Sequence, residues 1–300
     1  MTIAALARPS GLTLWMQAVR PRTLTISVVP VAVGLAFAWA DAGQFHPLTA
    51  LATLLGAVLI QAGTNLYNDA ADGERGLDQA GRVGPPRVTA EGWASAEQVK
   101  HGAWACFAAA ALAGLYLVAV GGWPILLLGV LSILAGWAYT GGPLPIAYTP
   151  LGEVFVFLFF GVAAVCGTAW LQAGAVTWVV LLAGAAIGLP AAAVLHVNNH
   201  RDRESDARAG RRTLAIVAGP EAAAALYAML VLAPFALLPA MWALLPHAAL
   251  WLPLGALPLA ARAIHGFAAE PPGRGLNRFL AETARVQAVY GTLLSLGVLL

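Results

Sequence analysis

The chain has 300 residues, of which 60% are hydrophobic and only 10% carry a charge, and its formal net charge is +2. Soluble domains contain roughly 45–50% apolar and about 25% charged residues, so this composition excludes an ordinary water-soluble domain. It indicates an integral membrane protein built as one helical bundle, for which no nucleic-acid partner is expected.

Nine apolar runs of about 20 residues, the length that crosses a bilayer, follow one another along the chain. They lie roughly at 23–40, 48–68, 101–120, 123–140, 151–170, 175–197, 221–243, 247–264 and 282–300. The predicted fold is therefore all-α and polytopic, a bundle of nine transmembrane helices. Similar polar strings end the second and the sixth run. We therefore expect residues 1–300 to form a single membrane-embedded domain of two weakly repeated four-helix halves, about 20–140 and 150–265, plus a ninth helix.

The basic residues test the number of spans. With nine spans, all 16 Lys and Arg residues fall in the N-terminal segment, in the connections 2–3, 6–7 and 8–9, or at span ends beside them. The connections near 41–47, 121–122, 171–174 and 244–246 carry none. Because Lys and Arg mark the cytoplasmic side, we expect the N-terminus inside and the C-terminus outside.

Two polar strings interrupt the apolar sequence, each at the cytoplasmic end of a predicted span. In the first, Asn65 stands four residues before Asp69, and Asp72 follows one turn later. Such spacing stacks these side chains along one helix face. The second string repeats the column with Asn198, Asp202 and Asp206.

Carboxylates crowded in this way repel one another unless they are protonated or bridged by a cation. A single carboxylate at a helix end is more often simply solvated, but two matching columns on one side of a membrane favour a shared function. Magnesium prefers carboxylate and phosphate oxygens. Two such clusters that face each other across a cavity predict divalent ions shared with a diphosphate.

A diphosphate also needs hydrogen-bond donors and cations on the same side. Arg82 and Arg87 flank Gly84-Pro85-Pro86 directly after the first column, and Arg201 is adjacent to Asp202. Taken singly, such an arginine is more often a topology determinant or a lipid-headgroup contact than a ligand of a diphosphate. The expected diphosphate-binding residues are Asn65, Asn68, Arg22, Arg82, Arg87, Asn198, Arg201 and Arg211.

An allylic diphosphate that ionises leaves a carbocation, and aromatic faces stabilise a desolvated cation by ~2 kcal/mol or more. The candidates to stabilise the cation or bind the acceptor lie near the predicted cytoplasmic end: Tyr67, Tyr139, Tyr148, Glu153 and Asp78. The aromatic residues are equally compatible with packing or interfacial anchoring. Glu153 is either a charge at a helix N-terminus or an acceptor-binding or proton-handling group. Asp78 lies beyond the helix end, where it is expected to orient a loop arginine.

Several longer motifs surround these residues. The first column continues through Gly76 and Asp78 to Arg82, Gly84-Pro85 and Arg87; the second through Arg201-Asp202 to Gly210 and Thr213-Leu214. Arg20-Pro21-Arg22-Thr23-Leu24, Tyr139-Thr140-Gly141-Gly142-Pro143 and Gly152-Glu153-Val154-Phe155 complete the set. Together they resemble the motifs of the UbiA-type membrane prenyltransferases, within them the 1,4-dihydroxy-2-naphthoate polyprenyltransferase branch of menaquinone synthesis. Two positions depart from that pattern: Ala70 replaces a frequent aromatic residue, and Arg211-Arg212 replaces the lysine usual before Thr213.

The resemblance implies a bundle with a central cavity that opens to the cytoplasmic side and laterally to lipid, in the bacterial cytoplasmic (inner) membrane. It implies Mg²⁺ as the cofactor, held by Asp69, Asp72, Asp202 and Asp206, which would also be the catalytic residues. Its partners would be polyprenyl diphosphate, the aromatic acceptor 1,4-dihydroxy-2-naphthoate and membrane lipids. The prenyl cation would attack the ring and replace its carboxylate, which leaves as CO₂, and demethylmenaquinone would form.

Two alternatives remain open. The same fold and chemistry would serve another phenolic acceptor, such as 4-hydroxybenzoate or homogentisate. A membrane transporter with carboxylate ion sites is the alternative from another class, but its acids are more often near the bilayer midplane. Here every acidic residue except Asp41 maps to the basic side or to a nearby span end.

Overall fold

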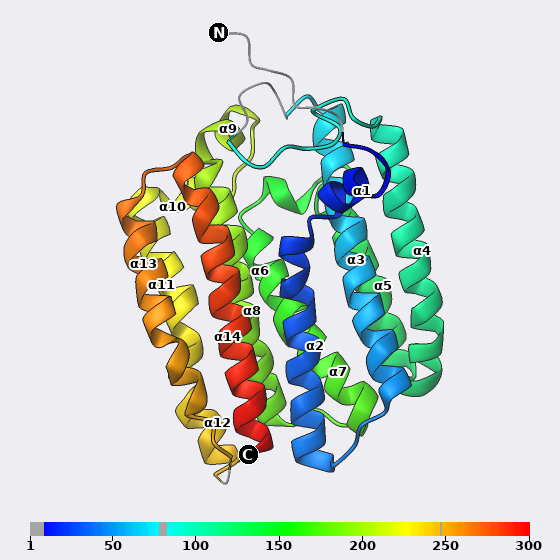
Figure 1. Ribbon diagram of the computed structural model, residues 1–300, viewed down its shortest axis with the longest axis vertical. Coiled ribbons are helices and arrows are strands. Elements are labelled where there is room, and N and C mark those ends of the chain that lie inside the picture. Colours follow the sequence, from blue (N-terminus) through cyan, green and yellow to red (C-terminus); the bar gives the residue numbers. More distant parts are fainter. Residues whose placement is uncertain (1–8, 78–82, 247) are drawn as a thin grey trace.

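The computed structural model describes residues 9–77, 83–246 and 248–300, except for the side chain of Arg22. Within these ranges the regular structure is helical, with no strand. The long helices lie side by side and run between the two ends of the molecule (Figure 1). They are α2 (Pro21–Ala42), α3 (Pro47–Glu74), α4 (Ala96–Gly121), α5 (Trp123–Ala138), α8 (Trp178–Arg201), α11 (Pro220–Ala236), α13 (Leu257–Ala269) and α14 (Asn277–Leu299).

One further crossing is made of three consecutive pieces, α6 (Gly152–Phe157), the π-helical turn η2 (Leu158–Ala163) and α7 (Ala164–Ala173). A short helix, α12 (Leu238–Leu244), continues α11 after a bend at Leu237, three residues beyond Pro234. Proline removes a backbone donor and clashes with the preceding turn, which explains the bend. The connections contain α1 (Gly11–Val19), η1 (Ile146–Tyr148), α9 (Arg203–Arg208), α10 (Leu214–Ala218), η3 (Leu252–Ala256) and η4 (Arg274–Leu276).

Seven segments of the described chain are long and apolar enough to cross a membrane. They are Thr23–Ala42, Pro47–Glu74, Ala96–Gly121, Gly152–Ala173, Trp178–Arg201, Pro220–Leu244 and Leu252–Ala269. The remaining two predicted spans correspond to α5, an apolar helix of 16 residues, and to α14, whose first half carries Arg278, Glu282 and Arg285. An all-helical membrane protein is therefore confirmed, while the count of nine spans stays a prediction.

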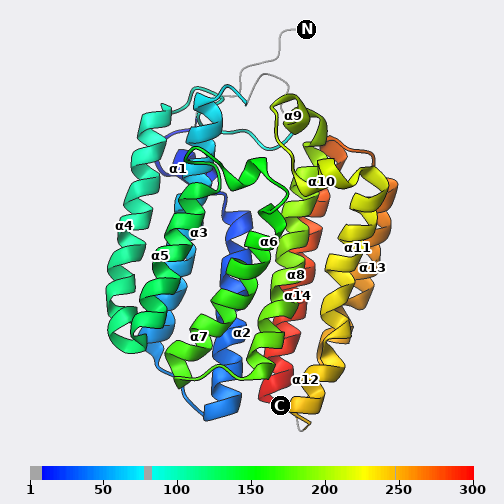
Figure 2. The same ribbon diagram turned by 180° about the vertical axis from the view of Figure 1, so that it is seen from behind.

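Helix α8 is the centre of the bundle. It packs against α14, α11 and the α6–η2 segment. In its most apolar stretch of 18 residues, 67% of the residues are buried inside the protein. Helix α2 lies beside α7 and α14, with α3, α4 and α5 on one side of this centre and α11 and α13 on the other (Figures 1 and 2). Phe37, Ile187 and Tyr290 pack in the main hydrophobic core.

The contact between η2 and α8 depends on glycine. A Cβ atom built on Gly161 would lie closer to the Cα atom of Gly188 than real atoms approach. The two backbones therefore touch here, as small residues permit in membrane bundles. The π-helical turn beside this contact carries Phe159 and Phe160, whose side chains line the cavity described below.

Candidate active site

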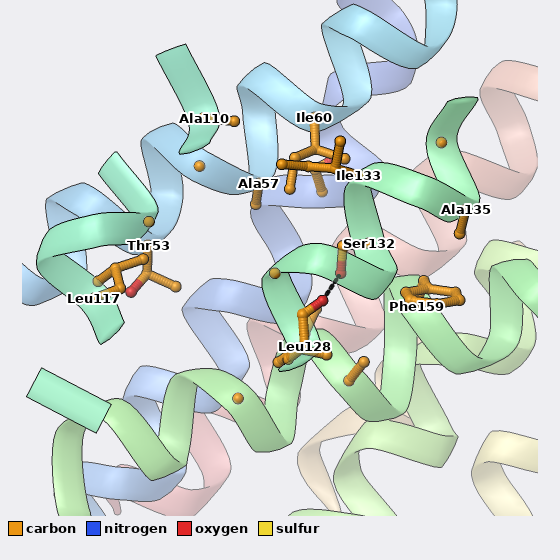
Figure 3. A pocket seen from close by; sticks show the side chains of 18 of the residues that line it. Thr53, Ala57, Ile60, Ala110, Leu117, Leu128, Ser132, Ile133, Ala135 and Phe159 are labelled. Atoms are coloured by element: carbon orange, nitrogen blue, oxygen red, sulfur yellow. Dashed lines mark hydrogen bonds between the residues drawn. The ribbon is translucent and has the colours of Figure 1, made fainter. Parts of the chain in front are cut away.

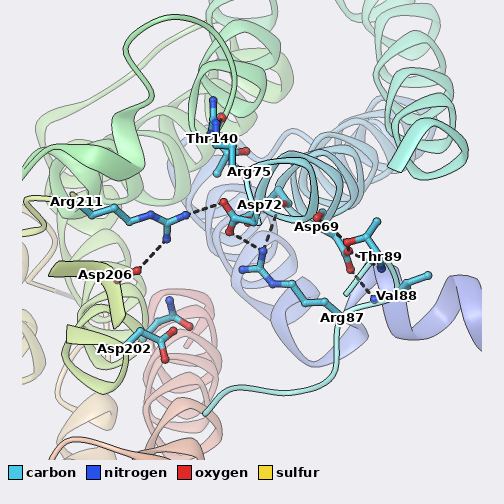
Figure 4. A network of polar contacts seen from close by, with 12 residues as sticks. Asp69, Asp72, Arg75, Arg87, Val88, Thr89, Thr140, Asp202, Asp206 and Arg211 are labelled. Atoms are coloured by element: carbon cyan, nitrogen blue, oxygen red, sulfur yellow. Dashed lines mark hydrogen bonds and ion pairs between the residues drawn. The ribbon is translucent and has the colours of Figure 1, made fainter. Parts of the chain in front are cut away.

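Both polar columns lie at the same end of the bundle. Asp69 and Asp72 stand near the C-terminal end of α3, and Asn198 stands in the last turn of α8. Asp202 is the residue that joins α8 to α9, and Asp206 belongs to α9. Figure 4 shows the two columns facing each other, with arginine side chains between them. Residues far apart in the chain therefore lie close together here (Figure 4), while their role in binding metal and diphosphate stays a prediction.

Asp72 is the centre of this cluster. It is buried, and its two carboxylate oxygens bind different arginines: Arg87 Nη1 lies 2.5 Å from one oxygen and Arg211 Nη2 lies 2.6 Å from the other. Arg211 also donates to Asp206 at 3.1 Å, so it connects the first column to the second. Charge-assisted hydrogen bonds of this length are about twice as strong as neutral ones.

Asp206 shows the effect of this crowding. Burial raises the pKa of its carboxyl to about 6 against the opposing effect of Arg211, and the nearby Asp202 and Asp72 carboxylates add to the rise. A bound cation would remove this penalty, because it favours the ionised form of all three groups.

Arg201 organises the second column. Its guanidinium donates to both oxygens of Asp202, at 2.8 and 2.5 Å, and to Asn198 Oδ1 at 2.8 Å. It also donates to Asn277 Oδ1 at 2.9 Å, and the Asn277 amide donates to the Val83 carbonyl at 3.0 Å. No sequence pattern pointed to Asn277, which begins α14 outside the motifs named above.

Asp69 has different partners. Its carboxylate accepts the backbone N–H groups of Val88 and Thr89, both at 3.0 Å, and the Thr89 hydroxyl. Both oxygens of this buried side chain are therefore occupied by one loop. Thr89 is a second residue that sequence reasoning missed.

The two asparagines of the first column differ from each other. The Asn65 amide donates to the Val19 carbonyl at 2.8 Å and to Thr23 Oγ1 at 3.1 Å, so it ties α3 to the junction of α1 and α2. Asn68 Oδ1 is buried and accepts no hydrogen bond from the described residues. Asn68 stands one turn before Asp72, so its side-chain oxygen is a candidate ligand for a cation bound at the cluster. Two predicted site residues, Asp78 and Arg82, lie outside the described residues, as does the side chain of Arg22.

The three predicted tyrosines have separate surroundings. The Tyr148 ring packs under Arg211 and Arg75, whose guanidinium carbons lie 5.1 and 5.5 Å from its centroid. The Tyr67 hydroxyl accepts Trp137 Nε1 at 3.1 Å. Tyr139 lines the apolar cavity.

Glu153 belongs to a buried polar cluster between α6, α8 and α11. Its Oε1 atom lies 3.1 Å from His196 Nδ1 and accepts the Asn199 amide at 3.1 Å. His196 Nε2 lies 2.9 Å from the Ala223 carbonyl, which only accepts, so this nitrogen carries a proton. Sequence reasoning missed His196, which lies within an apolar span and outside the motifs named above. Glu153 is absent from the cavity wall.

A partly open apolar cavity of about 320 Å³ is lined by residues of α2, α3, α4, α5 and the α6–η2–α7 crossing. Its wall consists of aliphatic, glycine and aromatic residues, with a few polar groups such as Ser132 and Thr53 (Figure 3). Tyr139, Phe155 and Phe159 contribute aromatic rings. The cavity therefore suits an extended hydrocarbon and is unsuited to a diphosphate.

The acidic cluster suits a magnesium ion only in part. Among the described residues, no three His, Cys, Asp or Glu side chains converge closely enough to hold an ion by themselves. The donors that are present, carboxylates and the Asn68 amide oxygen, are nevertheless the hard oxygen ligands that Mg²⁺ takes. The site therefore fits an ion whose coordination is completed by water or phosphate oxygens.

Comparison with known proteins places this geometry in a family. Residues 27–280 match the model of the UbiA prenyltransferase family. The chain is 37% identical over 279 residues to the 1,4-dihydroxy-2-naphthoate octaprenyltransferase of Mycobacterium tuberculosis, covering 92% of this chain and 93% of that one. The enzyme of the same name from Escherichia coli is 38% identical over 211 residues, 68% of each chain.

Solved structures agree on the fold. A UbiA homolog from Archaeoglobus fulgidus bound to DMAPP and Mg²⁺ superposes with a TM-score of 0.63 at 19% identity, over 94% of this chain and 99% of that one. A UbiA homolog from Aeropyrum pernix gives a TM-score of 0.68 at 20% identity, over 90% and 96%. The chain belongs to the UbiA prenyltransferase family, and its fold is the membrane fold of that family.

Proposed function

We propose that this protein transfers a polyprenyl group from polyprenyl diphosphate to 1,4-dihydroxy-2-naphthoate with loss of CO₂ and diphosphate, to give demethylmenaquinone in its reduced, quinol form. The observation that carries the proposal is the link from Asp72 through Arg211 to Asp206, which joins the two acidic columns at the same end of a bundle with an apolar cavity. Relatives that match most of the chain at 33–37% identity bear the name of this activity.

The donor's diphosphate would lie among the arginines of the two columns. Arg87, Arg201 and Arg211 already bind carboxylates there, so each has a guanidinium oriented toward the cluster. Planar guanidinium groups bind phosphate oxygens in pairs and stay charged at any working pH. Asp72, Asp202 and Asp206, with Asn68, would hold the metal. When bound, Mg²⁺ neutralises the diphosphate and makes it a better leaving group.

The hydrocarbon tail would occupy the apolar cavity. As the C–O bond to the diphosphate breaks, positive charge develops on the first carbons of the tail. Tyr139, Phe155 and Phe159 offer ring faces on the cavity wall, and such faces stabilise a desolvated cation. The same wall keeps water from the cation, which would otherwise be captured as an alcohol. A longer tail would continue laterally into lipid. The size of the cavity would then not limit the length of the prenyl chain that the protein accepts.

The orientation in the membrane is part of the same proposal. All nine predicted spans would cross a bacterial cytoplasmic membrane, with the N-terminus inside and the C-terminus outside. The site would then face the cytoplasm, where a soluble acceptor and Mg²⁺ are available. The domain would consist of two four-helix halves, about 20–140 and 150–265, with α14 as the ninth span.

An acceptor panel tests the proposal. The purified protein is supplied with one polyprenyl diphosphate, Mg²⁺ and, separately, 1,4-dihydroxy-2-naphthoate, 4-hydroxybenzoate or homogentisate. We expect the quinol of demethylmenaquinone, which air oxidises to the quinone during extraction, and CO₂ in equal amounts with the naphthoate and no product with the other two. Product from only another phenol would overturn the acceptor. Failure to release diphosphate with any acceptor would overturn the prenyl transfer itself.

A further inference from the structure

We propose that Asp69 acts as a positioning residue that fastens the loop carrying Arg87 and Thr89 onto α3, and that it does not bind the metal. The sequence predicts the opposite role, because Asp69 and Asp72 belong to one acidic column. The proposal concerns the site described above, and for its kinetic part it rests on the proposed function.

The first argument is the occupancy of the Asp69 carboxylate. One oxygen accepts the Val88 N–H, and the other accepts both the N–H and the hydroxyl of Thr89. These three donors use three of the about four lone-pair sites of the carboxylate, so a metal ion that made more than one contact with Asp69 would have to displace a donor of the loop. A backbone donor that loses its acceptor in this buried region is left unpaired at a cost of desolvation.

Asp72 provides the contrast within the same helix. One of its oxygens accepts from the Arg87 side chain and the other from the Arg211 side chain. Arginine side chains can turn from a carboxylate to an incoming phosphate without leaving a charge unpaired. Asp72 can therefore exchange these partners for a metal ion, whereas Asp69 would have to release backbone donors of the loop to free its carboxylate in the same way.

A second, independent argument is the shape of α3 beside this loop. A Cβ atom built on Gly73, one turn after Asp69, would lie 2.6 Å from Thr89 Oγ1 and 2.9 Å from Thr89 Cβ. Only glycine allows threonine to sit this close to the helix. Thr89 Oγ1 also lies 2.9 Å from the Asp69 backbone carbonyl, an alternative acceptor for the same hydroxyl proton, and Val88 is completely buried. The helix surface is therefore shaped to receive this loop.

The consequence reaches the active site through Arg87. Two prolines, Pro85 and Pro86, restrict the backbone before Arg87, and the Asp69 anchor fixes the two residues after it. With both sides fixed, Arg87 Nη1 lies 2.5 Å from Asp72 and 3.3 Å from the Asn68 carbonyl. Loss of the anchor would leave the Arg87 charge in place but would make its position variable, which weakens binding of the diphosphate.

The first test needs neither metal nor substrate. Purified Asp69→Asn, Thr89→Val, Thr89→Ser and wild-type proteins are digested with trypsin in EDTA, and cleavage after Arg87 is followed by mass spectrometry. We expect cleavage about tenfold faster in Asp69→Asn and Thr89→Val, which lose the charged acceptor or the hydroxyl, and near-normal protection in Thr89→Ser. Wild-type rates in both Asp69→Asn and Thr89→Val would overturn the anchor.

The second test separates the anchor from a metal ligand. The Mg²⁺ concentration for half-maximal activity and the KM for polyprenyl diphosphate are measured for Asp69→Asn, Thr89→Val and Asp72→Asn. We expect the first two to raise the KM about tenfold at an Mg²⁺ requirement within about twofold of wild type, and Asp72→Asn to raise that requirement at least about tenfold. An Mg²⁺ requirement raised equally in Asp69→Asn and Asp72→Asn would overturn the proposal. Absence of prenyl transfer in the wild type would refute the proposed function and leave the proteolysis result valid.

Discussion

Arg211 donates to Asp72 at 2.6 Å although the two residues are 139 positions apart in the sequence. The same guanidinium binds Asp206, so one side chain joins α3 to the segment after α8. Burial alone would lower the pKa of Arg211, but the Asp72 and Asp206 carboxylates raise it well above its ordinary value. The Arg211 guanidinium therefore stays protonated. Its removal would leave the Asp72 and Asp206 carboxylates without their shared partner.

Substitution of Arg211 should weaken binding of the diphosphate, by an amount that depends on the replacing residue. Lysine keeps the charge but cannot donate to two carboxylates with a planar fork, so Arg211→Lys should retain measurable turnover with a KM for the diphosphate raised about tenfold. Arg211→Gln should lose about 10²–10³-fold in kcat/KM, as removal of a charge-stabilising donor does elsewhere. Steady-state kinetics on both variants measures the difference. Equal activity of the two variants would show that the charge is unimportant.

The carboxylates of the second column should be indispensable. Asp202→Ala and Asp206→Ala are expected to reduce prenyl transfer at least about 10²-fold while the protein still inserts into membranes, because each removes a proposed metal ligand. Asp41→Ala, at the opposite end of α2 and exposed, is the matched control and should behave as wild type. Normal turnover in either Asp202→Ala or Asp206→Ala would contradict the two-column mechanism.

Steric filling of the cavity tests where the tail lies. Gly129 lines the cavity and has open space where a Cβ atom would stand, so Gly129→Phe should fill part of it. We expect the KM for a long polyprenyl diphosphate to rise at least about fivefold, with a smaller change for dimethylallyl diphosphate. Leu127→Phe, on the exposed face of the same helix, is the control. An equal change of KM for the two donors would indicate that the tail does not lie in this cavity.

Glu153 is expected to stabilise the protein more than it assists the reaction. Glu153→Leu removes the partner of His196 and Asn199 and should cost about 3–5 kcal/mol of stability, the range found when a buried pair loses one member. Glu153→Gln can donate to His196 Nδ1 and should retain both the folded state and turnover within about threefold. Thermal unfolding in detergent and initial rates distinguish the variants. Loss of turnover in a normally stable Glu153→Gln would instead indicate proton handling.

Accessibility of single cysteines tests the nine-span arrangement. After replacement of Cys106 and Cys166, cysteines at Glu91 and Ser205 should react with an impermeant maleimide only from the cytoplasmic side. Cysteines at Gln44 and Ala175 should react only from the opposite side. All four positions are exposed, so lack of access reflects the membrane rather than burial. Labelling of positions 44 and 205 from one side would refute the arrangement.

The helical architecture and the acidic columns could be predicted from the sequence because both are periodic features of short range. Asp69 and Asp72 fall on one face of α3 simply through their spacing. The partners of these residues could not be predicted in the same way. Asn277 reaches Val83 and Arg201, and Thr89 reaches Asp69, only because loops and helices distant in sequence pack together.

The crossing between α6 and α7 illustrates a different limit. The apolar run at 151–170 predicts a continuous helix, but the chain makes a π-helical turn at Leu158–Ala163. The π-helical turn cannot be recognised within the apolar run, because each of its six residues is hydrophobic or glycine. It is coupled to the contact between Gly161 and Gly188, a packing arrangement that no local pattern reveals.

The apolar wall of the cavity has a consequence for handling the protein outside its membrane. The alkyl chain of a solubilising detergent has the same chemistry as an isoprenoid tail, and at working concentrations it greatly outnumbers the substrate. Detergent bound between α3 and α5 would occupy the surface that we propose for the donor's tail and would compete with it. Apparent affinities will therefore depend on the amphiphile chosen, and those obtained in lipid nanodiscs will describe the enzyme more faithfully than those obtained in micelles.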